Sequence, residues 1–287
     1  MTRTPIGFSY GGRDPDLAEK LVPVVDYLEL TPDDLVVVDG DRTRLDPEVI
    51  AHLRDLGSEV PFVAHGVGLS IGTATGVSAI YLSVLDQLLD AIELELHSEH
   101  LGYTTVDGHF LGTMLNVPRT DEALDLITGR VGELQERYGL PFLLENVANL
   151  LPDPGGSWSP AGFLNELVDR TGCGLILDVY NLECDRANVG RDVGAYLAEI
   201  RFDAVAEIHV AGGVQEAGFQ LDVHSRRTRP STLELAGQVT DRIPGTRVTF
   251  EALPQAVPAI GHDGIIEELT RLRAFLDNRP ALAGAAR

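Results

Sequence analysis

The amino-acid sequence predicts an α/β protein folded as a closed (β/α)8 TIM barrel. Short apolar runs typical of buried strands alternate with segments of helical spacing, which gives about eight β/α units. Several of these runs stop at a His, Asp or Glu, and a closed barrel gathers the carboxyl ends of its strands at one mouth. The length of 287 residues is usual for one such barrel. An open doubly wound sheet, the alternative, would scatter these polar residues.

The expected elements alternate from the amino terminus onwards. Runs rich in aliphatic and β-branched residues predict strands at 5–9, 24–30, 60–64, 92–96, 141–144, 175–177, 204–208 and 247–250. Segments of helical spacing predict helices at 16–21, 47–56, 78–91, 122–138, 160–169, 192–200, 232–242 and 263–275.

Because these signals continue at the same spacing, we expect one catalytic domain over residues 1–287. The most loop-like stretch, residues 152–157, is interpreted as a long loop between a strand and the next helix. No apolar run is long enough to span a bilayer, and residues 1–5 lead into the first strand without the apolar stretch of a secretory signal. We therefore expect a cytoplasmic protein with no membrane partner.

The charge balance argues against some partners. There are 44 acidic and 22 basic side chains, and the resulting formal charge of -22 repels phosphate backbones, so we expect no nucleic acid partner. The local exception is the basic loop of Arg226, Arg227 and Arg229, which would either hold a substrate carboxylate or simply be exposed. Cys173 and Cys184 are too few for a disulfide framework and are expected to be reduced.

Polar residues with metal-binding chemistry recur where the apolar runs stop. They are His65, His100, Glu145, Asp178, His209, His224 and Glu251. In a closed barrel these side chains would face one another at the mouth. So many buried imidazoles and carboxylates would carry uncompensated charge, so two or three metal ions are expected. Mixed imidazole and carboxylate ligands without thiolate suit iron, manganese or zinc.

Seven short motifs then carry a resemblance to a known family. They are HGVGLSIG at 65–72, SEHLGY at 98–103, LENV at 144–147, LDVYNL at 177–182, EIHVAG at 207–212, DVHS at 222–225 and FE at 250–251. In this order they resemble the multinuclear non-heme iron-dependent oxidative enzymes, whose barrel is xylose-isomerase-like. The resemblance implies two or three irons in mixed Fe(II) and Fe(III) states, with O2 as cosubstrate. It also implies oxidative modification of residues, often Cys, in a ribosomally synthesised precursor peptide, as in methanobactin biosynthesis, and allows for a partner protein that presents the peptide.

The resemblance also assigns metal ligands residue by residue. They are His65, His100, Glu145, Asp178, His209, Asp222, His224 and Glu251, with Asn181 as a further ligand or a supporting group. Of these, Glu145, Asp178 and His209 would carry the catalytic role as iron ligands. His97 belongs to the same segment as His100, but strand alternation turns it to the other face.

Four segments depart from the family pattern. The family commonly has Arg soon after the first strand, Glu-Asn after the second, His after the Ala-Gly of the seventh and Arg-Asp after the last Glu. This chain has GFSY at 7–10, TPDD at 31–34, Gly213, and Ala252 with Leu253. The departures put the substrate and the transformation in question more than the metal.

Two other classes of function remain open from the sequence. A redox-neutral hydrolase, isomerase or endonuclease on the same barrel would hold two or three zinc, manganese or magnesium ions. An isomerase of this kind usually places Lys near its metals, and this chain has a single Lys, Lys20, near the first helix. A non-catalytic metal-binding or scaffold role is the third class.

Overall fold

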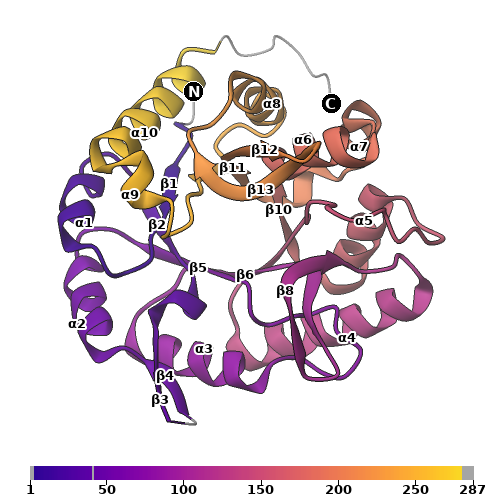
Figure 1. The fold of residues 1–287 in the computed structure, drawn as a ribbon, viewed down its shortest axis with the longest axis horizontal. Helices are drawn as coiled ribbons and strands as arrows, with labels where there is room; N and C mark the ends of the chain where they lie inside the picture. Colours follow the sequence, from indigo (N-terminus) through magenta and orange to yellow (C-terminus); the bar gives the residue numbers. More distant parts are fainter. Residues whose placement is uncertain (1–2, 41, 280–287) are drawn as a thin grey trace.

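The structure of this protein, a computed structural model, describes residues 3–40 and 42–279. Its centre is a closed barrel of eight parallel strands, which confirms the predicted fold class (Figure 1). In their order around the barrel the strands are β1 (Ile6–Ser9), β14 (Arg247–Phe250), β11 (Val205–Val210), β10 (Gly174–Asp178), β9 (Phe142–Glu145), β6 (His97–His100), β5 (Phe62–Gly66) and β2 (Tyr27–Leu30).

Helices follow the barrel strands and surround them, as Figure 1 shows. The outer helices are α1 (Pro15–Leu21), α2 (Pro47–Leu56), α3 (Ala79–Ala91), α4 (Asp121–Tyr138), α5 (Pro160–Thr171), α7 (Val193–Glu199), α8 (Pro230–Thr240) and α10 (His262–Asp277). Local chemistry sets their ends. Helix α4, for example, begins after Thr120, whose side chain accepts a hydrogen bond from the backbone N–H of Ala123, and it ends at Gly139 with a φ of 64°. Among the described helices, none has the length and apolar character needed to cross a membrane.

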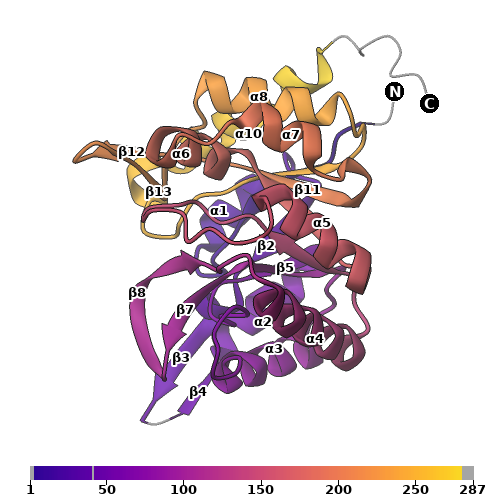
Figure 2. The same ribbon diagram turned by 90° about the vertical axis from the view of Figure 1, so that its right-hand side faces the viewer.

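Three β-hairpins stand at the carboxyl ends of barrel strands, and the sequence did not lead us to expect them. They are β3 (Val36–Asp39) with β4 (Arg42–Leu45), β7 (Gly102–Val106) with β8 (His109–Asn116), and β12 (Gly212–Glu216) with β13 (Phe219–Arg226). Figure 2 shows all three on the same side of the molecule, which is the mouth of the barrel. Asp107 and Gly108 turn the second hairpin with φ of 48° and 76°, and this Asp-Gly pair was a usable hairpin signal.

Four helices were also missed, of which α6 (Val179–Val189) bears most on the site. It starts directly after β10, and the side chain of Asp178 accepts a hydrogen bond from the backbone N–H of Asn181 in its first turn. The others are α9 (Val257–Ile260) and two 3-10 helices, η1 (Pro32–Leu35) and η2 (Phe202–Ala204).

The predicted fourth strand was placed too early. Residues 92–96 alternate Ile-Glu-Leu-Glu-Leu like a half-buried strand, but the strand is β6, His97–His100. The neighbours decide this register, because His97 is opposite Ala64 of β5 and Phe142 of β9. His100 is therefore part of the strand that was expected to end before it.

Alternation along the strands divides the apolar residues between two cores. The larger core fills the space between strands and helices and includes Phe62, Leu144 and Leu177. The smaller core fills the inside of the barrel and consists of Tyr27, Val63, Leu96, Leu143 and Ile176. This inner layer closes the barrel beneath the mouth, so polar groups above it can be approached only from the carboxyl ends of the strands.

Candidate metal centre

The candidate site begins one layer above the apolar residues inside the barrel. Two positions after Tyr27, Val63, Leu143 and Ile176 on their strands come Glu29, His65, Glu145 and Asp178. Side chains two positions apart on a strand point to the same face, so these four also point into the barrel. All four are at most 1% exposed. The period-two alternation of the strands therefore places a layer of polar side chains directly above the apolar residues inside the barrel, and we call these apolar residues the apolar floor.

Glu145 lies at the centre of the first group of side chains. Its Oε2 atom is 2.9 Å from Nε2 of His65 and 3.5 Å from Nε2 of His100. One ligand atom from each of these three residues lies within 4.8 Å of the others. Two imidazoles and a carboxylate thus share a space of the size of a metal coordination sphere.

A second group adjoins the first and shares Glu145 with it. Ligand atoms of Glu145, Asp178, His209 and Glu251 all lie within 4.8 Å of one another. Nδ1 of His209 is 3.2 Å from Oε2 of Glu251 and 3.8 Å from Oε2 of Glu145. Glu145 therefore belongs to both groups.

A third group comes from the hairpin β12–β13 and the end of β10. Nε2 of His224 is 2.5 Å from Oδ1 of Asp222 and 3.9 Å from Oδ2 of Asp178, and its Nδ1 is 3.2 Å from Oε1 of Glu251. His224 holds a φ of 36°, in the left-handed region, which costs a residue without glycine's freedom about 1–3 kcal/mol. Such strain tends to occur at functional sites and persists only where the surrounding structure enforces it.

Asn181 points its side chain at the same space. Its Nδ2 atom donates to the carbonyl oxygen of Asn146 at 3.0 Å and lies 3.4 Å from Oε1 of Glu145. Its Oδ1 atom is buried without a hydrogen-bond partner. The structure therefore brings all nine predicted site residues to the mouth of the barrel.

The unpaired polar atoms are the main sign that a cation belongs here. Buried atoms without a hydrogen-bond partner include His65 Nε2, Glu145 Oε2, Asp178 Oδ2, Asn181 Oδ1, His209 Nδ1, His224 Nε2 and Glu251 Oε2. Several of these atoms lie within 4 Å of each other but lack hydrogen-bond geometry, because they point into shared space rather than at each other. Leaving buried polar groups unpaired costs about 1–3 kcal/mol each, and a bound cation would remove that cost.

Three histidines are held so that one defined nitrogen faces the centre. Nδ1 of His65 bonds to Oγ of Ser98 at 2.9 Å, and Nδ1 of His100 bonds to the carbonyl oxygen of Gly66 at 3.0 Å. Nε2 of His209 bonds to Oε2 of Glu29 at 3.0 Å. Metal-binding histidines are typically oriented in this way by a partner on the second ring nitrogen. The residue set therefore fits a metal ion.

In the metal-free cluster, the pKa of one group depends on the charges of its neighbours. Burial lowers the pKa of His65, but the neighbouring carboxylates, Glu145 foremost, outweigh burial and raise this pKa to about 9. Burial raises the pKa of Glu145, but three adjacent imidazoles outweigh it and lower this pKa to about 2. Asp178 is surrounded by carboxylates, so burial and like charge together hold its pKa well above the usual value. In the metal-free protein, protons on the imidazoles therefore supply the positive charge that bound cations would otherwise supply.

The remaining histidines lie away from this centre, as expected. His97 points outside the barrel, where its Nε2 is 2.9 Å from Oε1 of Glu99 and 3.2 Å from the hydroxyl of Tyr81. His52 bonds to the hydroxyl of Tyr10, His262 to Asp14, and His109 is exposed on β8. The two cysteines are buried and free, as predicted.

The sequence reasoning missed two buried carboxylates, Glu29 and Glu207, that form a group with His209. Oε1 of Glu207 accepts a hydrogen bond from the hydroxyl of Tyr27 at 2.8 Å. The apolar run 24–30 passes through Glu29, and no motif marks it. The alternation of Tyr27, Leu28 and Glu29 was the available signal, because it puts Glu29 on the same face as Tyr27.

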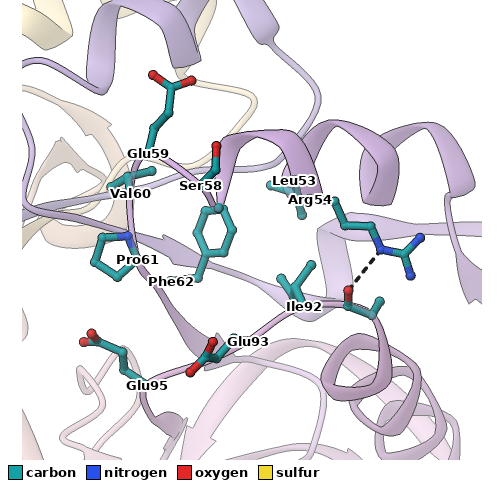
Figure 3. A pocket seen from close by; sticks show the side chains of 12 residues that line it. Leu53, Arg54, Ser58, Glu59, Val60, Pro61, Phe62, Ile92, Glu93 and Glu95 are labelled. Carbon is teal, nitrogen blue, oxygen red and sulfur yellow. Dashed lines mark hydrogen bonds between the residues drawn. The ribbon is translucent and has the colours of Figure 1, made fainter.

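Hollows on the surface lie at both ends of the barrel. One of about 570 Å³ is at the amino ends of β5 and β6, lined by Arg54, Pro61, Phe62 and Glu93 (Figure 3). It is separated from the polar layer by the apolar floor, so it has no part in this site. Another, of about 320 Å³, opens beside Glu251. Ser9, Tyr10, Asp33, Asp34, Ala252 and Leu253 also line it. Three of the four segments that depart from the family pattern thus meet in this one hollow.

The fold and the site define a class of protein, a xylose-isomerase-like TIM barrel with buried imidazoles and carboxylates at the carboxyl ends of its strands. A family described as "RiPP precursor modification enzyme MbnB/TglH/ChrH" matches residues 8–277. The chain belongs to this family.

The chain is also similar to curated proteins described as UPF0276. A UPF0276 protein of Chromobacterium violaceum is 36% identical over 237 residues, covering 83% of this chain and 82% of that protein. One from Caulobacter vibrioides is 31% identical over 278 residues, covering 96% of each.

The structural neighbours share the fold at low identity. A xylose isomerase domain-containing protein of Salmonella typhimurium has a TM-score of 0.64 at 14% identity, covering 96% of this chain and 98% of that one. Endonuclease IV of Thermus thermophilus has a TM-score of 0.57 at 18% identity, covering 96% and 100%. D-Psicose 3-epimerase of Clostridium cellulolyticum has a TM-score of 0.56 at 13% identity, covering 96% and 98%.

Proposed function

We propose that this protein is an oxidoreductase that uses two or three non-heme irons and O2 to modify residues, often Cys, of a ribosomally synthesised precursor peptide. Membership of the peptide-modifying family supports the substrate class. The observation that carries the metal is the set of buried, unpaired imidazole and carboxylate atoms that point into shared space at the barrel mouth. Nitrogen and oxygen ligands without thiolate suit iron that keeps open positions for substrate and O2.

Eight of the proposed ligands belong to the three groups already described, and Asn181 lies beside Glu145. The full set is His65, His100, Glu145, Asp178, Asn181, His209, Asp222, His224 and Glu251. Glu145, Asp178 and His209 are proposed as the catalytic ligands. Glu145 belongs to the first and the second group, His209 of the second group also forms a group with His65 and Glu251, and Asp178 belongs to the second and the third group. One carboxylate shared by two groups favours more than one ion.

Bound iron would supply O2 binding and electron transfer, which protein side chains do not provide by themselves. The chain's own groups prepare the site for this. Ser98, Gly66 and Glu29 hold three imidazoles in one orientation, which avoids reorganisation when the ligands bind. The apolar floor closes the site from below, and Glu251, 8% exposed, lies on the side from which substrate can approach.

The proposal also includes a cytoplasmic setting, a single catalytic domain and a partner protein that presents the peptide. The family supports the peptide itself. A partner would be detected by co-purification with the precursor peptide, and its loss should weaken peptide binding without changing metal content.

A redox-neutral metal hydrolase or isomerase is the second candidate. The observation in its favour is the fold shared with endonuclease IV and sugar epimerases. Against an isomerase that uses Lys, the chain's single Lys, Lys20, pairs with Asp263 on the outer helices at 2.7 Å. The formal charge of -22 disfavours a nucleic-acid substrate.

The deciding experiment is metal analysis of protein made in iron-supplemented cells and purified without oxygen. Two or three irons per chain by elemental analysis, with a ferrous or mixed-valence Mössbauer signal that changes on exposure to O2, are expected. The matched variants Glu145→Gln and Glu99→Gln each remove one buried carboxylate, and only the first should lose iron. Stoichiometric zinc or manganese with no iron would instead favour the redox-neutral enzyme.

A further inference from the structure

Two neighbouring hollows at the barrel mouth share six lining residues, and the inner one reaches the candidate metal centre. The inner hollow, of about 320 Å³, is lined by Glu251, and the outer one, of about 260 Å³, extends away from it. They share Ser9, Tyr10, Gly11, Asp34, Ala252 and Pro254. We call the two together the mouth groove. Glu251 has a fully buried Oε2 without a hydrogen-bond partner, so the inner end of the groove adjoins unpaired ligand atoms.

The described residues that line the mouth groove include more acidic than basic side chains. Among the described residues, those lining the inner hollow include the carboxylates Asp33, Asp34 and Glu251 but no Lys, Arg or His. The outer hollow contains Arg13, whose guanidinium is bound to Asp46 at 2.6 Å and to the carbonyl oxygen of Val36 at 2.8 Å. Arg13 is thus paired with Asp46 outside the groove, but its Nε also donates to the backbone carbonyl oxygen of Asp34 at 3.2 Å, and its charge acts to lower the pKa of Asp34.

The acidic groups at the inner end are poorly solvated. Burial raises the pKa of Asp33, and the nearby charge of Glu99 adds to this effect. Burial likewise raises the pKa of Asp34. A positive charge entering the groove would compensate this desolvation, whereas a negative charge would increase the repulsion.

The basic loop does not supply the missing positive charge. Nη2 of Arg227 binds Oε2 of Glu267 at 2.6 Å on the surface, and Nη1 of Arg229 donates to Oε1 of Gln220 at 2.6 Å. No residue of the basic loop lines either hollow of the mouth groove. Binding of a substrate carboxylate by these arginines therefore finds no support at the groove.

The rim of the groove is apolar. Phe110 at the end of the β7–β8 hairpin is 73% exposed, Leu253 is 41% exposed and Val67 is 39% exposed, and all three line the inner hollow. Exposed apolar side chains around a polar centre favour a substrate with apolar surface next to its reacting group.

We propose that the mouth groove is the substrate entrance and that it selects a peptide segment that is neutral or cationic, and rejects an anionic one, next to the reacting side chain. This inference rests on the proposed peptide-modifying function. Selectivity comes from Asp33 and Asp34, because the one basic side chain that lines the groove among the described residues, Arg13, is held by Asp46 and offsets only part of the effect of burial on Asp34. At separations of several ångströms, and at an effective dielectric between those of protein and water, one charge pair changes a dissociation constant by about fivefold, so probes of opposite charge differ by more than about tenfold.

The test measures the binding of three small thiols of similar size to the protein loaded with cobalt(II), a redox-inert stand-in for iron. Cysteamine is cationic, 2-mercaptoethanol neutral and 3-mercaptopropionate anionic, and each should add a thiolate-to-cobalt absorption band. At low salt we expect cysteamine to bind at least about tenfold more tightly than 3-mercaptopropionate, with 2-mercaptoethanol between them. Asp34→Asn should reduce this ratio severalfold. Asp39→Asn, which removes the same charge from the exposed β3–β4 hairpin, should leave it unchanged.

Each result of this test either supports or overturns the proposed role of the mouth groove. Bands from all three thiols with equal dissociation constants, or a ratio insensitive to Asp34→Asn, would overturn the charge selectivity and leave the proposed function standing. The absence of a thiolate band from any probe would overturn the groove as an entrance for thiols and would also count against thiol chemistry at the metals. The inference would be supported if the three dissociation constants differ in the expected order and if Asp34→Asn, but not Asp39→Asn, reduces the difference between them.

Discussion

Removal of the Glu29 side chain should weaken metal binding although Glu29 is not a proposed ligand. Its Oε2 accepts a hydrogen bond from Nε2 of His209 at 3.0 Å, and both groups are fully buried. Without this acceptor the imidazole can rotate or place its proton on Nδ1, the atom that faces the other ligands. A buried hydrogen bond to a charged group is worth about 1.5–3 kcal/mol, which corresponds to a loss of about 10–100-fold in metal affinity.

The assay is a competition titration of cobalt(II) or ferrous iron against a chelator, without oxygen, on metal-free protein. Glu29→Ala should show the full loss, whereas Glu29→Gln keeps an acceptor without the charge and should lose less. Glu268→Gln is the matched control, because Glu268 is an equally buried carboxylate that pairs with Arg271 far from the centre. If Glu29→Ala remains folded by circular dichroism and binds metal within twofold of the unaltered protein, the orienting role is refuted.

Three further predictions concern the same centre. Removal of the metal with a chelator should lower the melting temperature by about 8–16 °C, because a metal present at about 1,000 times its dissociation constant contributes about 4 kcal/mol to folding. An unchanged unfolding transition after verified metal loss would contradict this prediction. In metal-free protein the pKa of His65 is raised from its ordinary value of 6.5 to about 9, so up to about 3 kcal/mol of stability is present below pH 6.5 and is lost as the pH rises through 9. Urea titrations at both pH values measure this loss, which metal-loaded protein should lack. His100→Gln should reduce the metal content, whereas His97→Gln, on the opposite face of β6, should not. Equal losses of metal by elemental analysis would refute the conclusion that only His100 faces the metal centre.

The sequence was most informative where local pattern and tertiary environment agree. Barrel strands such as β5 and β14 are buried on both faces, so they read as continuous apolar runs and were predicted closely. Helices such as α4 carry their own start and stop residues, Thr120 and Gly139, and their predicted bounds were close to the observed ones. In both cases the information lies within a few neighbouring residues.

Prediction failed where pairing partners decide the structure. Residues 92–96 had strand-like alternation, yet the ladder forms at His97–His100, because those residues are in register with β5 and β9. The three hairpins are short, partly exposed and held by antiparallel pairing, so their apolar periodicity was weak. Helix α6 was missed because it follows β10 without a loop.

For the site, the sequence by itself determined which residue types stand at the ends of the barrel strands. Strand alternation and the motif resemblance located nine residues that the structure gathers at one mouth. Only the tertiary structure showed that Glu145 belongs to two groups, that Glu29 holds His209, and that three of the four departing segments share one groove. The physical reason is that residue type and period follow from a few neighbouring positions, whereas these distances join strands far apart in the chain and are set by closure of the barrel.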